Sequence, residues 1–280
     1  MNFFYAVLLG LIQGLTEFIP ISSTAHLTLT GKLLGLIDEQ NARAWTAFIA
    51  VMQLGTLAAV IVYFFKDVVG MGIALIRDVR SNSMKSYSRE SRLAIYIIAG
   101  TIPVGLVGIF ASDILHGMFT KNTLVITISL VALAALLWLA EKGAKHGRSI
   151  DEITLGDALL IGVAQVLALI PGSSRSGTTI TAGLFLNFTR YSAARFSFLL
   201  SIPAVMASGL YELTMIDQSA FQFGVLNLFV ATVVSAISGY AAIAWLLRFL
   251  QKNTTMVFVW YRFSLGLVIT LMLLFGIIQP

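Results

Sequence analysis

Long apolar runs dominate this sequence, and six of them have the length of a membrane-crossing helix. They lie at about 45 to 65, 93 to 111, 122 to 140, 196 to 213, 223 to 247 and 257 to 278. A helix needs about 20 apolar residues to cross the hydrocarbon core of a bilayer. The pattern therefore predicts an all-α polytopic membrane protein with six transmembrane helices.

Two further apolar regions, at about 3 to 30 and 157 to 187, are interrupted near their middle. Each contains a proline followed by polar residues, "FIPISSTAH" in the first and "LIPGSSRSG" in the second. Non-helical backbone at membrane depth is tolerated only where it is buried in protein or lines a watery cavity. We therefore expect two re-entrant helical hairpins rather than two more crossings.

Composition agrees with a lipid environment. Of the 280 residues, 58% are hydrophobic and 11% charged, against roughly 25% charged residues in an ordinary soluble domain. The chain has no cysteine, which excludes disulfides, thiolate metal sites and cysteine nucleophiles. The net charge of +5 comes from basic residues in the loops between spans, so it reports orientation and does not indicate nucleic-acid binding.

The loop from 66 to 92 is the most basic part of the chain, with Lys66, Arg77, Arg80, Lys85, Arg89 and Arg92. Positively charged loops stay in the cytoplasm. The loop at 141 to 156 then also faces the cytoplasm, and the links at 112 to 121 and 214 to 222 face the outside. With six crossings, both termini are predicted to be external.

The two interrupted regions resemble each other. Each has a glutamine (Gln13 and Gln165) ahead of an Ile-Pro pair, followed after one residue by two serines. On this pattern Ser22 corresponds to Ser173 and Ser23 to Ser174. We expect a single membrane domain, 1 to 280, with repeat one at about 1 to 140 and repeat two at about 157 to 280. Because each repeat holds three spans, an odd number, the repeats have inverted topology and the two polar tips meet near the midplane.

A half-helix that follows proline, glycine and serines offers free N–H groups and hydroxyls, and Arg175 adds a guanidinium. These groups suit an oxyanion, phosphate above all. The alternative is that the serines and threonines only cap helices or join them by hydrogen bonds. An arginine at membrane depth is costly and favours a functional site.

The first tip contributes a carboxylate and an imidazole. Gln13 and Glu17 are four residues apart and share a helix face, and a buried Glu17 needs a cation or a proton. Arg175 can be that partner, in a catalytic site or in a simple structural ion pair. His26 is close enough in sequence to exchange a proton with Ser23, or it is an ordinary polar residue at a loop end.

The segments "QGLTEFIPISSTAH" (13 to 26) and "PGSSRSGTT" (171 to 179) resemble the two signature motifs of the undecaprenyl-diphosphatase family, the bacitracin-resistance phosphatases of bacterial membranes. The resemblance extends over nearly the whole chain, including "VMQLGTLAAV" (51 to 60) and "RFSFLLSIPA" (195 to 204). It implies hydrolysis of undecaprenyl diphosphate to undecaprenyl phosphate and phosphate, which recycles the lipid carrier of peptidoglycan synthesis. It also implies an active site open to the periplasmic side of the bacterial inner membrane, the side on which the basic loops place both termini.

The resemblance implies particular residue roles. The catalytic candidates are Glu17, Ser23, His26 and Arg175; the substrate-binding candidates are Gln13, Ser22, Thr24, Ser173, Ser174, Arg175, Ser176, Gly177 and Thr179. A divalent metal is also implied, Mg²⁺ first and Ca²⁺ as the alternative, with Glu17 as its ligand. Some relatives have glutamate at the position of Gln13, so a second carboxylate ligand is not assumed. The attacking group is either Ser23 or a water that His26 or Glu17 deprotonates.

Two other interpretations stay open. An inverted-repeat transporter or flippase of a polyprenyl phosphate or another organic anion would use the same arginine and serines. A scaffold protein would use the polar tips only as contacts between helices, which leaves Arg175 and Glu17 unexplained. Bilayer lipids and a polyprenyl diphosphate are the expected partners. A homodimer is an option, because Gly10 with Gly14 and Gly105 with Gly108 permit close helix contact within or between chains.

Overall fold

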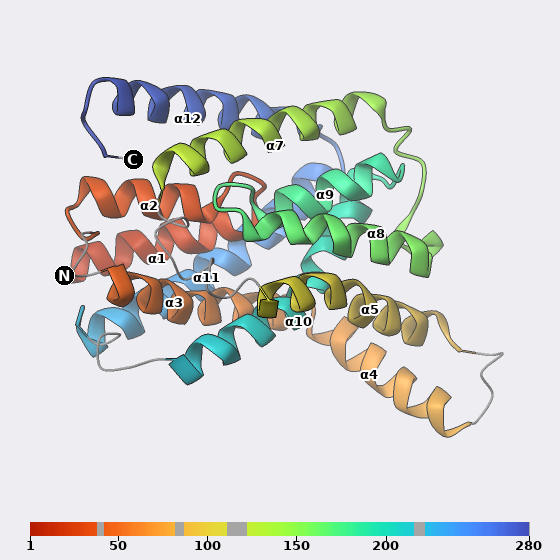
Figure 1. Ribbon diagram of the computed structural model, residues 1–280. Coiled ribbons are helices and arrows are strands. Elements are labelled where there is room, and N and C mark those ends of the chain that lie inside the picture. The colour runs from red at the N-terminus through yellow and green to blue at the C-terminus, as the bar shows by residue number, and fades with distance from the viewer. Residues whose placement is uncertain (38–41, 82–86, 111–121, 216–221, 280) are drawn as a thin grey trace.

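A computed structural model describes all residues except 38–41, 82–86, 111–121, 216–221 and 280. The described part is all-helical, with no β-strand (Figure 1). Its α-helices are α1 (Phe3–Phe18), α2 (Ser23–Leu33), α3 (Ala42–Tyr63), α4 (Phe65–Arg80), α5 (Arg89–Phe110), α7 (Thr123–Gly143), α8 (Leu155–Val166), α9 (Arg175–Phe185), α10 (Arg190–Met215), α11 (Val225–Leu250) and α12 (Met256–Leu274). Two short 3₁₀ helices, η3 (Ile150–Glu152) and η4 (Leu167–Leu169), flank α8.

The six predicted spans are confirmed as long apolar helices. In the described residues, six helices have the length and composition to cross a membrane, namely α3, α5, α7, α10, α11 and α12. Helix α10 begins at Arg190 rather than 196, because its polar first turns lie ahead of the apolar run. Together these helices make the protein a multi-pass membrane protein.

The basic segment after the first span contains a helix that the sequence analysis treated as loop. Helix α4 packs on α5 and leaves Val69, Ile73 and Ile76 exposed along one side. Its average hydropathy is too low for a span, and its apolar residues recur at three- and four-residue intervals, the period of an amphipathic helix. The predicted links at 112–121 and most of 214–222, and Lys85, lie outside the described residues.

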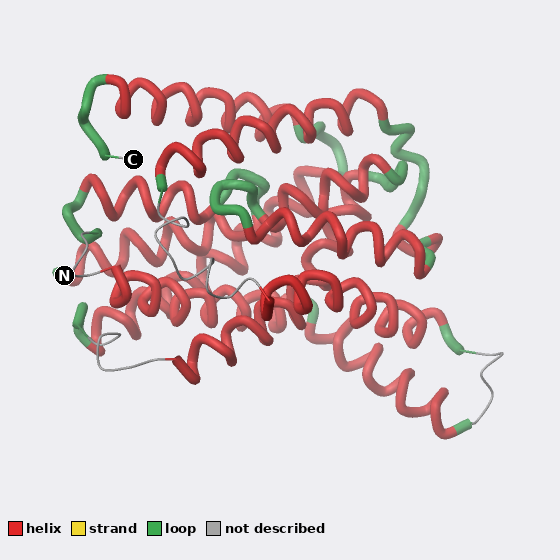
Figure 2. Tube along the Cα trace, viewed as in Figure 1, coloured by secondary structure: helices red, strands yellow, loops and turns green. Residues whose placement is uncertain are grey.

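The two interrupted regions form helix–turn–helix units that enter the molecule from opposite ends. In Figure 1 the α1/α2 unit opens toward the side of both termini, and the α8/α9 unit opens toward the other side. Figure 2 shows the loops between their helices close together near the middle of the molecule. The tips of the two units therefore lie next to each other, as predicted.

The second helices of these units are built alike. Helices α2 and α9 each have 11 residues, and the serine that caps each N-terminus, Ser22 or Ser174, has a left-handed backbone with φ of 75° or 70°. The predicted pairing of Ser22 with Ser173 and of Ser23 with Ser174 is therefore wrong by one residue. By their positions at the start of the helices, Ser22 corresponds to Ser174 and Ser23 to Arg175. The reason is an additional residue after the second proline, Gly172, whose φ of 94° favours glycine.

Small residues allow the first helix of each unit to pack closely on a long span. A Cβ added to Gly10 would lie 2.5 Å from the carbonyl oxygen of Ala231 on α11, and Gly14 faces the same helix. In the second unit, Gly162 of α8 packs directly on the backbone of Gly100 on α5. The glycine spacing at 10 and 14 is thus used within the chain.

Candidate active site

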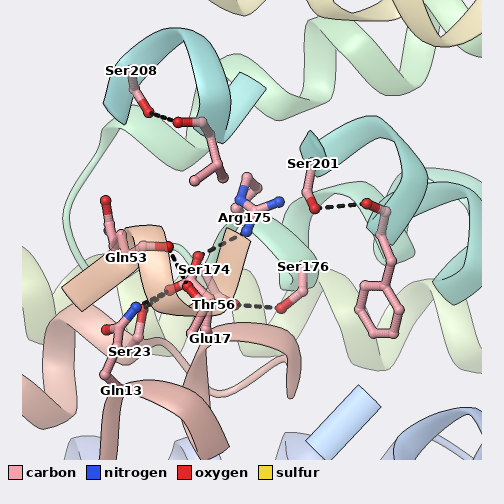
Figure 3. A network of polar contacts seen from close by, with 12 residues as sticks. Gln13, Glu17, Ser23, Gln53, Thr56, Ser174, Arg175, Ser176, Ser201 and Ser208 are labelled. Atoms are coloured by element: carbon pink, nitrogen blue, oxygen red, sulfur yellow. Dashed lines mark hydrogen bonds and ion pairs between the residues drawn. The ribbon is translucent and has the colours of Figure 1, made fainter. Parts of the chain in front are cut away.

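The carboxylate of Glu17 is the centre of a polar network between the two tips. Its Oε1 accepts a hydrogen bond of 2.7 Å from Nη2 of Arg175. Its Oε2 accepts bonds from the Ser23 hydroxyl at 2.8 Å and from Nε2 of Gln13 at 3.2 Å. Figure 3 shows these side chains pointing toward one another from opposite tips. The contact predicted between Glu17 and Arg175 is therefore present.

This junction is largely closed to solvent. The side chain of Glu17 is 7% exposed and that of Arg175 is 16% exposed. The two opposite charges compensate each other, which a buried carboxylate requires. Since Glu17 is bonded to only one nitrogen of the guanidinium, the remaining N–H groups of Arg175 are donors for another acceptor.

Serines of the second tip tie it to the first tip and to its own helix. The hydroxyl of Ser174 accepts from the backbone N–H of Gly177 at 3.1 Å and lies 3.2 Å from the Ser176 hydroxyl. Ser176 Oγ in turn donates to the carbonyl of Ile19 in the first tip, at 3.3 Å. Ser173 is fully buried, and its Oγ has no hydrogen-bond partner among the residues that the structure describes. The two tips are therefore in direct contact through side chain and backbone.

Several predicted binding residues have structural contacts. Thr179 Oγ1 is bonded to the Arg175 carbonyl and to Ser197 Oγ on α10, at 2.8 and 2.6 Å, so it joins helices. The Ser22 hydroxyl caps α2 by accepting from Ala25 N–H at 3.3 Å. Thr24 is exposed in the first turn of α2. For Thr179 and Ser22 the capping and helix-joining interpretation describes the observed bonds.

His26 is held by two partners, neither of which is Ser23. Its Nδ1 lies 2.7 Å from the Ser22 carbonyl, and its Nε2 lies 2.6 Å from the Tyr261 hydroxyl. A carbonyl can only accept, so Nδ1 carries a hydrogen, and in the neutral ring Nε2 accepts from the tyrosine. The Tyr261 ring also stacks on the imidazole, with 5.6 Å between centroids. The neighbour of the Ser23 hydroxyl is Glu17, not His26.

A second arginine, Arg262 on α12, reaches both tips and was missed by the sequence analysis. Its side chain is fully buried, and it donates to the carbonyls of Pro20 and of Gly172 and Ser173. The sequence could have indicated this residue, because Arg262 is the only charged residue in the predicted span at 257 to 278. The argument applied to Arg175, that an intramembrane arginine is a functional residue by default, applies equally to Arg262.

Polar residues of two spans surround the junction. Figure 3 shows Gln53 and Thr56 of α3 on one side of Arg175 and Ser201 and Ser208 of α10 on the other. Gln53 and Ser201 belong to segments 51 to 60 and 195 to 204, which carry part of the family resemblance. The sequence could have indicated these residues, because each is a polar residue inside an apolar span and the span follows a hairpin in the chain.

Metal ligands are few at this site. Among the described residues, no group of three or more His, Cys, Asp or Glu side chains is placed to hold a metal ion. Glu17 supplies a carboxylate, and Oε1 of the fully buried Gln13 is an oxygen without a hydrogen-bond partner. Mg²⁺ takes oxygen ligands and is commonly bound by one or two carboxylates together with waters and substrate phosphates. These two oxygens fit such a metal.

Fold and site together define a multi-pass membrane protein with a buried arginine–carboxylate junction between two helical hairpins. The family model of the bacitracin resistance protein BacA matches residues 6–268, and the chain belongs to this family. Its relatives include the undecaprenyl-diphosphatase of Syntrophobacter fumaroxidans, 51% identical over 95% of each chain. That of Myxococcus xanthus is 45% identical over 100% of this chain and 92% of its own. The enzyme of Renibacterium salmoninarum is 42% identical over 99% and 98%, respectively.

Proposed function

We propose that this protein is an integral membrane undecaprenyl-diphosphatase. It hydrolyses undecaprenyl diphosphate to undecaprenyl phosphate and inorganic phosphate, recycles the lipid carrier for peptidoglycan synthesis, and so confers bacitracin resistance. The observation that carries this conclusion is the Arg175–Glu17 contact at 2.7 Å between hairpins of a chain in the BacA family. An anion-binding cation and a carboxylate at the same buried point are the groups that phosphoryl transfer requires.

The two halves of the chain form an inverted-topology repeat with re-entrant hairpins. This assignment is supported by the opposite directions of α1/α2 and α8/α9 in Figure 1 and by the matching caps Ser22 and Ser174. From the family and the basic loops we infer a location in the bacterial inner membrane, with both termini and the entrance for the substrate on the periplasmic side. The basic loops lie in the cytoplasm, in accordance with the positive-inside rule.

The diphosphate binds between the tips. Arg175 turns from Glu17 to the phosphate oxygens, and Ser174 and Ser176 donate their hydroxyls. The first N–H groups of α2 and α9 have no intrahelical acceptor, so both helix N-termini also favour the negative charge. Because Glu17 is bonded to one nitrogen of Arg175, the diphosphate first meets the remaining N–H groups and then competes with the carboxylate for the guanidinium.

Glu17 and Ser23 are arranged for attack on the terminal phosphorus. The Ser23 hydroxyl already donates to Glu17 Oε2 at 2.8 Å, so the carboxylate receives its proton when Ser23 Oγ bonds to phosphorus. The bridging P–O bond breaks and undecaprenyl phosphate leaves; water then releases phosphate from the serine. In the alternative, a water in the same place loses its proton to Glu17 or His26. In the serine route, Nε2 of His26, which faces Tyr261, is the base that takes a proton from the water that cleaves the phosphoserine.

A divalent metal at this site would be held by Glu17 and the free Oε1 of Gln13, together with the diphosphate. When bound, it would neutralise charge on the phosphate oxygens. The junction around Glu17 is largely closed to solvent, which strengthens the charge interactions in it.

The test is phosphate release from undecaprenyl diphosphate by the purified protein in detergent, with Mg²⁺ and with chelator. We expect release that the chelator abolishes and that Arg175→Ala lowers by about a thousandfold, the effect of losing a charge-stabilising arginine. Substrate capture and turnover should both fall in this variant. A transporter cannot release phosphate in detergent, where no two compartments exist. Folded wild-type protein without phosphate release would therefore contradict the phosphatase and favour the transporter.

A further inference from the structure

The Arg262 guanidinium connects segments from three parts of the chain. Nε donates to the carbonyl of Leu130 on α7 at 3.1 Å, and Nη1 donates to that of Pro20 in the first tip at 3.4 Å. Nη2 donates to the carbonyls of Gly172 and Ser173 in the second tip, at 3.2 and 3.1 Å. A single side chain thus contacts the backbone of both tips and of a neighbouring span.

These partners are all uncharged carbonyl oxygens. A fully buried arginine is costly inside a membrane, and here its positive charge is met only by peptide dipoles in the described contacts. These bonds also give the tip carbonyls the hydrogen-bond donors they need, because non-helical backbone in a bilayer must find partners within the protein. The planar guanidinium, with five N–H donors in fixed directions, can meet several of them at once, which a lysine cannot.

The surrounding structure is shaped to admit this side chain. A Cβ at Gly177, in the first turn of α9, would lie 2.7 Å from Nη1 of Arg262. A corresponding contact comes from the other repeat, where Ser129 of α7 donates to the carbonyl of Pro171. Ser129 and Arg262 each lie six residues after the first residue of their helix. The last span of each repeat therefore contacts the tip of the other repeat, and Arg262 also bonds to the tip of its own repeat.

We propose that Arg262 is a positioning residue, which fixes the two tips relative to each other so that Glu17, Ser23 and Arg175 meet. It acts through the backbone of the tips and does not contact the substrate. This inference rests on the proposed phosphatase function for its kinetic consequence, and on geometry alone for its effect on the tips.

The kinetic experiment compares Arg262→Gln and Arg262→Lys with the wild type, using undecaprenyl diphosphate in detergent. Arg262→Gln should lower kcat by at least about 100-fold, because small displacements of reacting groups have effects of this size. KM should change much less, since Arg175 and the serines remain. Arg262→Lys keeps the positive charge but loses the planar group with several N–H donors. Its kcat should therefore lie between that of Arg262→Gln and that of the wild type. Wild-type kcat in folded Arg262→Lys or Arg262→Gln would overturn the proposal.

A second measurement reports on the tips without using activity. Amide hydrogen exchange should accelerate in Arg262→Gln at the N–H groups of Ile21 and Ser173, which bond within the tips to the carbonyls of Ile19 and Ile170. Exchange in α12 and α11 should stay slow. If Arg262→Gln does not fold, the same exchange experiment on Arg262→Lys decides the question.

Arg148 offers a matched control. It also donates to two backbone carbonyls, those of Leu186 and Glu152, at 3.1 and 3.0 Å, but at the other end of the α8/α9 unit. Arg148→Gln should lower the melting temperature and leave kcat and exchange at the tips unchanged. If the tips of Arg262→Gln exchange as slowly as in the wild type while kcat falls, Arg262 acts on the substrate directly and the positioning role is wrong. Absence of phosphate release in the wild type would refute the proposed function but leave the exchange result valid.

Discussion

The two hairpin tips have nearly the same backbone and carry different chemistry. Each begins its second helix with a left-handed serine cap, Ser22 or Ser174, and each helix runs for 11 residues. At the next position, however, the first tip has Ser23 and the second has Arg175. The two tips thus present similar helix N-termini and differ in the side chain that follows the cap, a hydroxyl in the first tip and a guanidinium in the second.

Under the proposed function, this difference would allow two similar tips to support an asymmetric reaction. The carboxylate Glu17 belongs to the first tip and has no acidic counterpart in the second, where Leu169 lies at the same distance before the cap. One carboxylate between a hydroxyl and a guanidinium can accept a proton from one side and balance a charge on the other. Two identical tips would place like charges together, which is unfavourable in a buried site.

Exchanging the charges of the two tips should have the largest effect. The double variant Glu17→Arg with Arg175→Glu keeps an ion pair but moves the carboxylate away from Ser23. We expect kcat/KM to fall by about a thousandfold or more, as for loss of an essential phosphate-binding arginine, while the melting temperature recovers relative to either single variant. Recovery of activity together with stability would mean that the pair is only structural.

Removing the imidazole from the first tip should come next. His26→Ala should lower kcat by about 100-fold or more, the size of a general acid–base contribution, with little change in KM. Tyr261→Phe removes only the hydrogen bond to Nε2 and should lower kcat by up to about tenfold. Thr178 stands at the matching place in the second tip and bonds to the Arg175 carbonyl at 2.9 Å. Thr178→Val should keep its kcat; equal losses at His26 and Thr178 would contradict a specific role for the imidazole.

A carboxylate outside both tips should affect stability alone. Asp78 on α4 accepts from the Ser88 hydroxyl and from Ser91, at 2.6 and 2.7 Å, and these bonds hold the pKa of Asp78 well below its usual range. A lowered pKa stabilises the folded state above the ordinary value of 3.8, and the stabilisation is lost as the pH falls further toward the folded-state pKa.

The melting temperature of the wild type should therefore exceed that of Asp78→Asn at pH 7, and the difference should shrink below about pH 4. The kcat of Asp78→Asn at pH 7 should equal that of the wild type. A difference in melting temperature that does not change between pH 7 and pH 3 would show that the bonds to Ser88 and Ser91 do not act through ionisation.

Several features of the fold could be predicted from sequence. Six spans followed from the length of the apolar runs, and the meeting of the tips followed from two similar polar interruptions. Helix α4 was missed because its apolar residues form only one stripe. The pairing of Ser22 with Ser173 was wrong by one residue, because Gly172 lengthens the second tip without changing the visible "Ile-Pro" and "Ser-Ser" pattern.

The candidate site was only partly predictable. Glu17, Ser23, His26 and Arg175 were expected to converge; Glu17 does bond to Ser23 and Arg175, and to Gln13 as well, whereas His26 bonds to other partners. The partner of His26 was not foreseen, since Tyr261 is 235 residues away in the chain. Arg262 could have been recognised as an unusual intramembrane charge. Its four carbonyl partners could not, because every residue has a backbone carbonyl and the sequence does not show which of them accept a hydrogen bond.

By itself, the sequence determined that the chain enters a membrane and that two polar interruptions are retained within it. Both follow from transfer free energies, which depend on the side chains of a local segment. Only the tertiary structure decided that Ser23 bonds to Glu17, that His26 bonds to Tyr261 and that Arg262 holds both tips. The first contact depends on the turn between α1 and α2, and the other two depend on how α7 and α12 pack over the hairpins. Such packing is set by the shapes of three-dimensional surfaces, which the order of residues does not show directly.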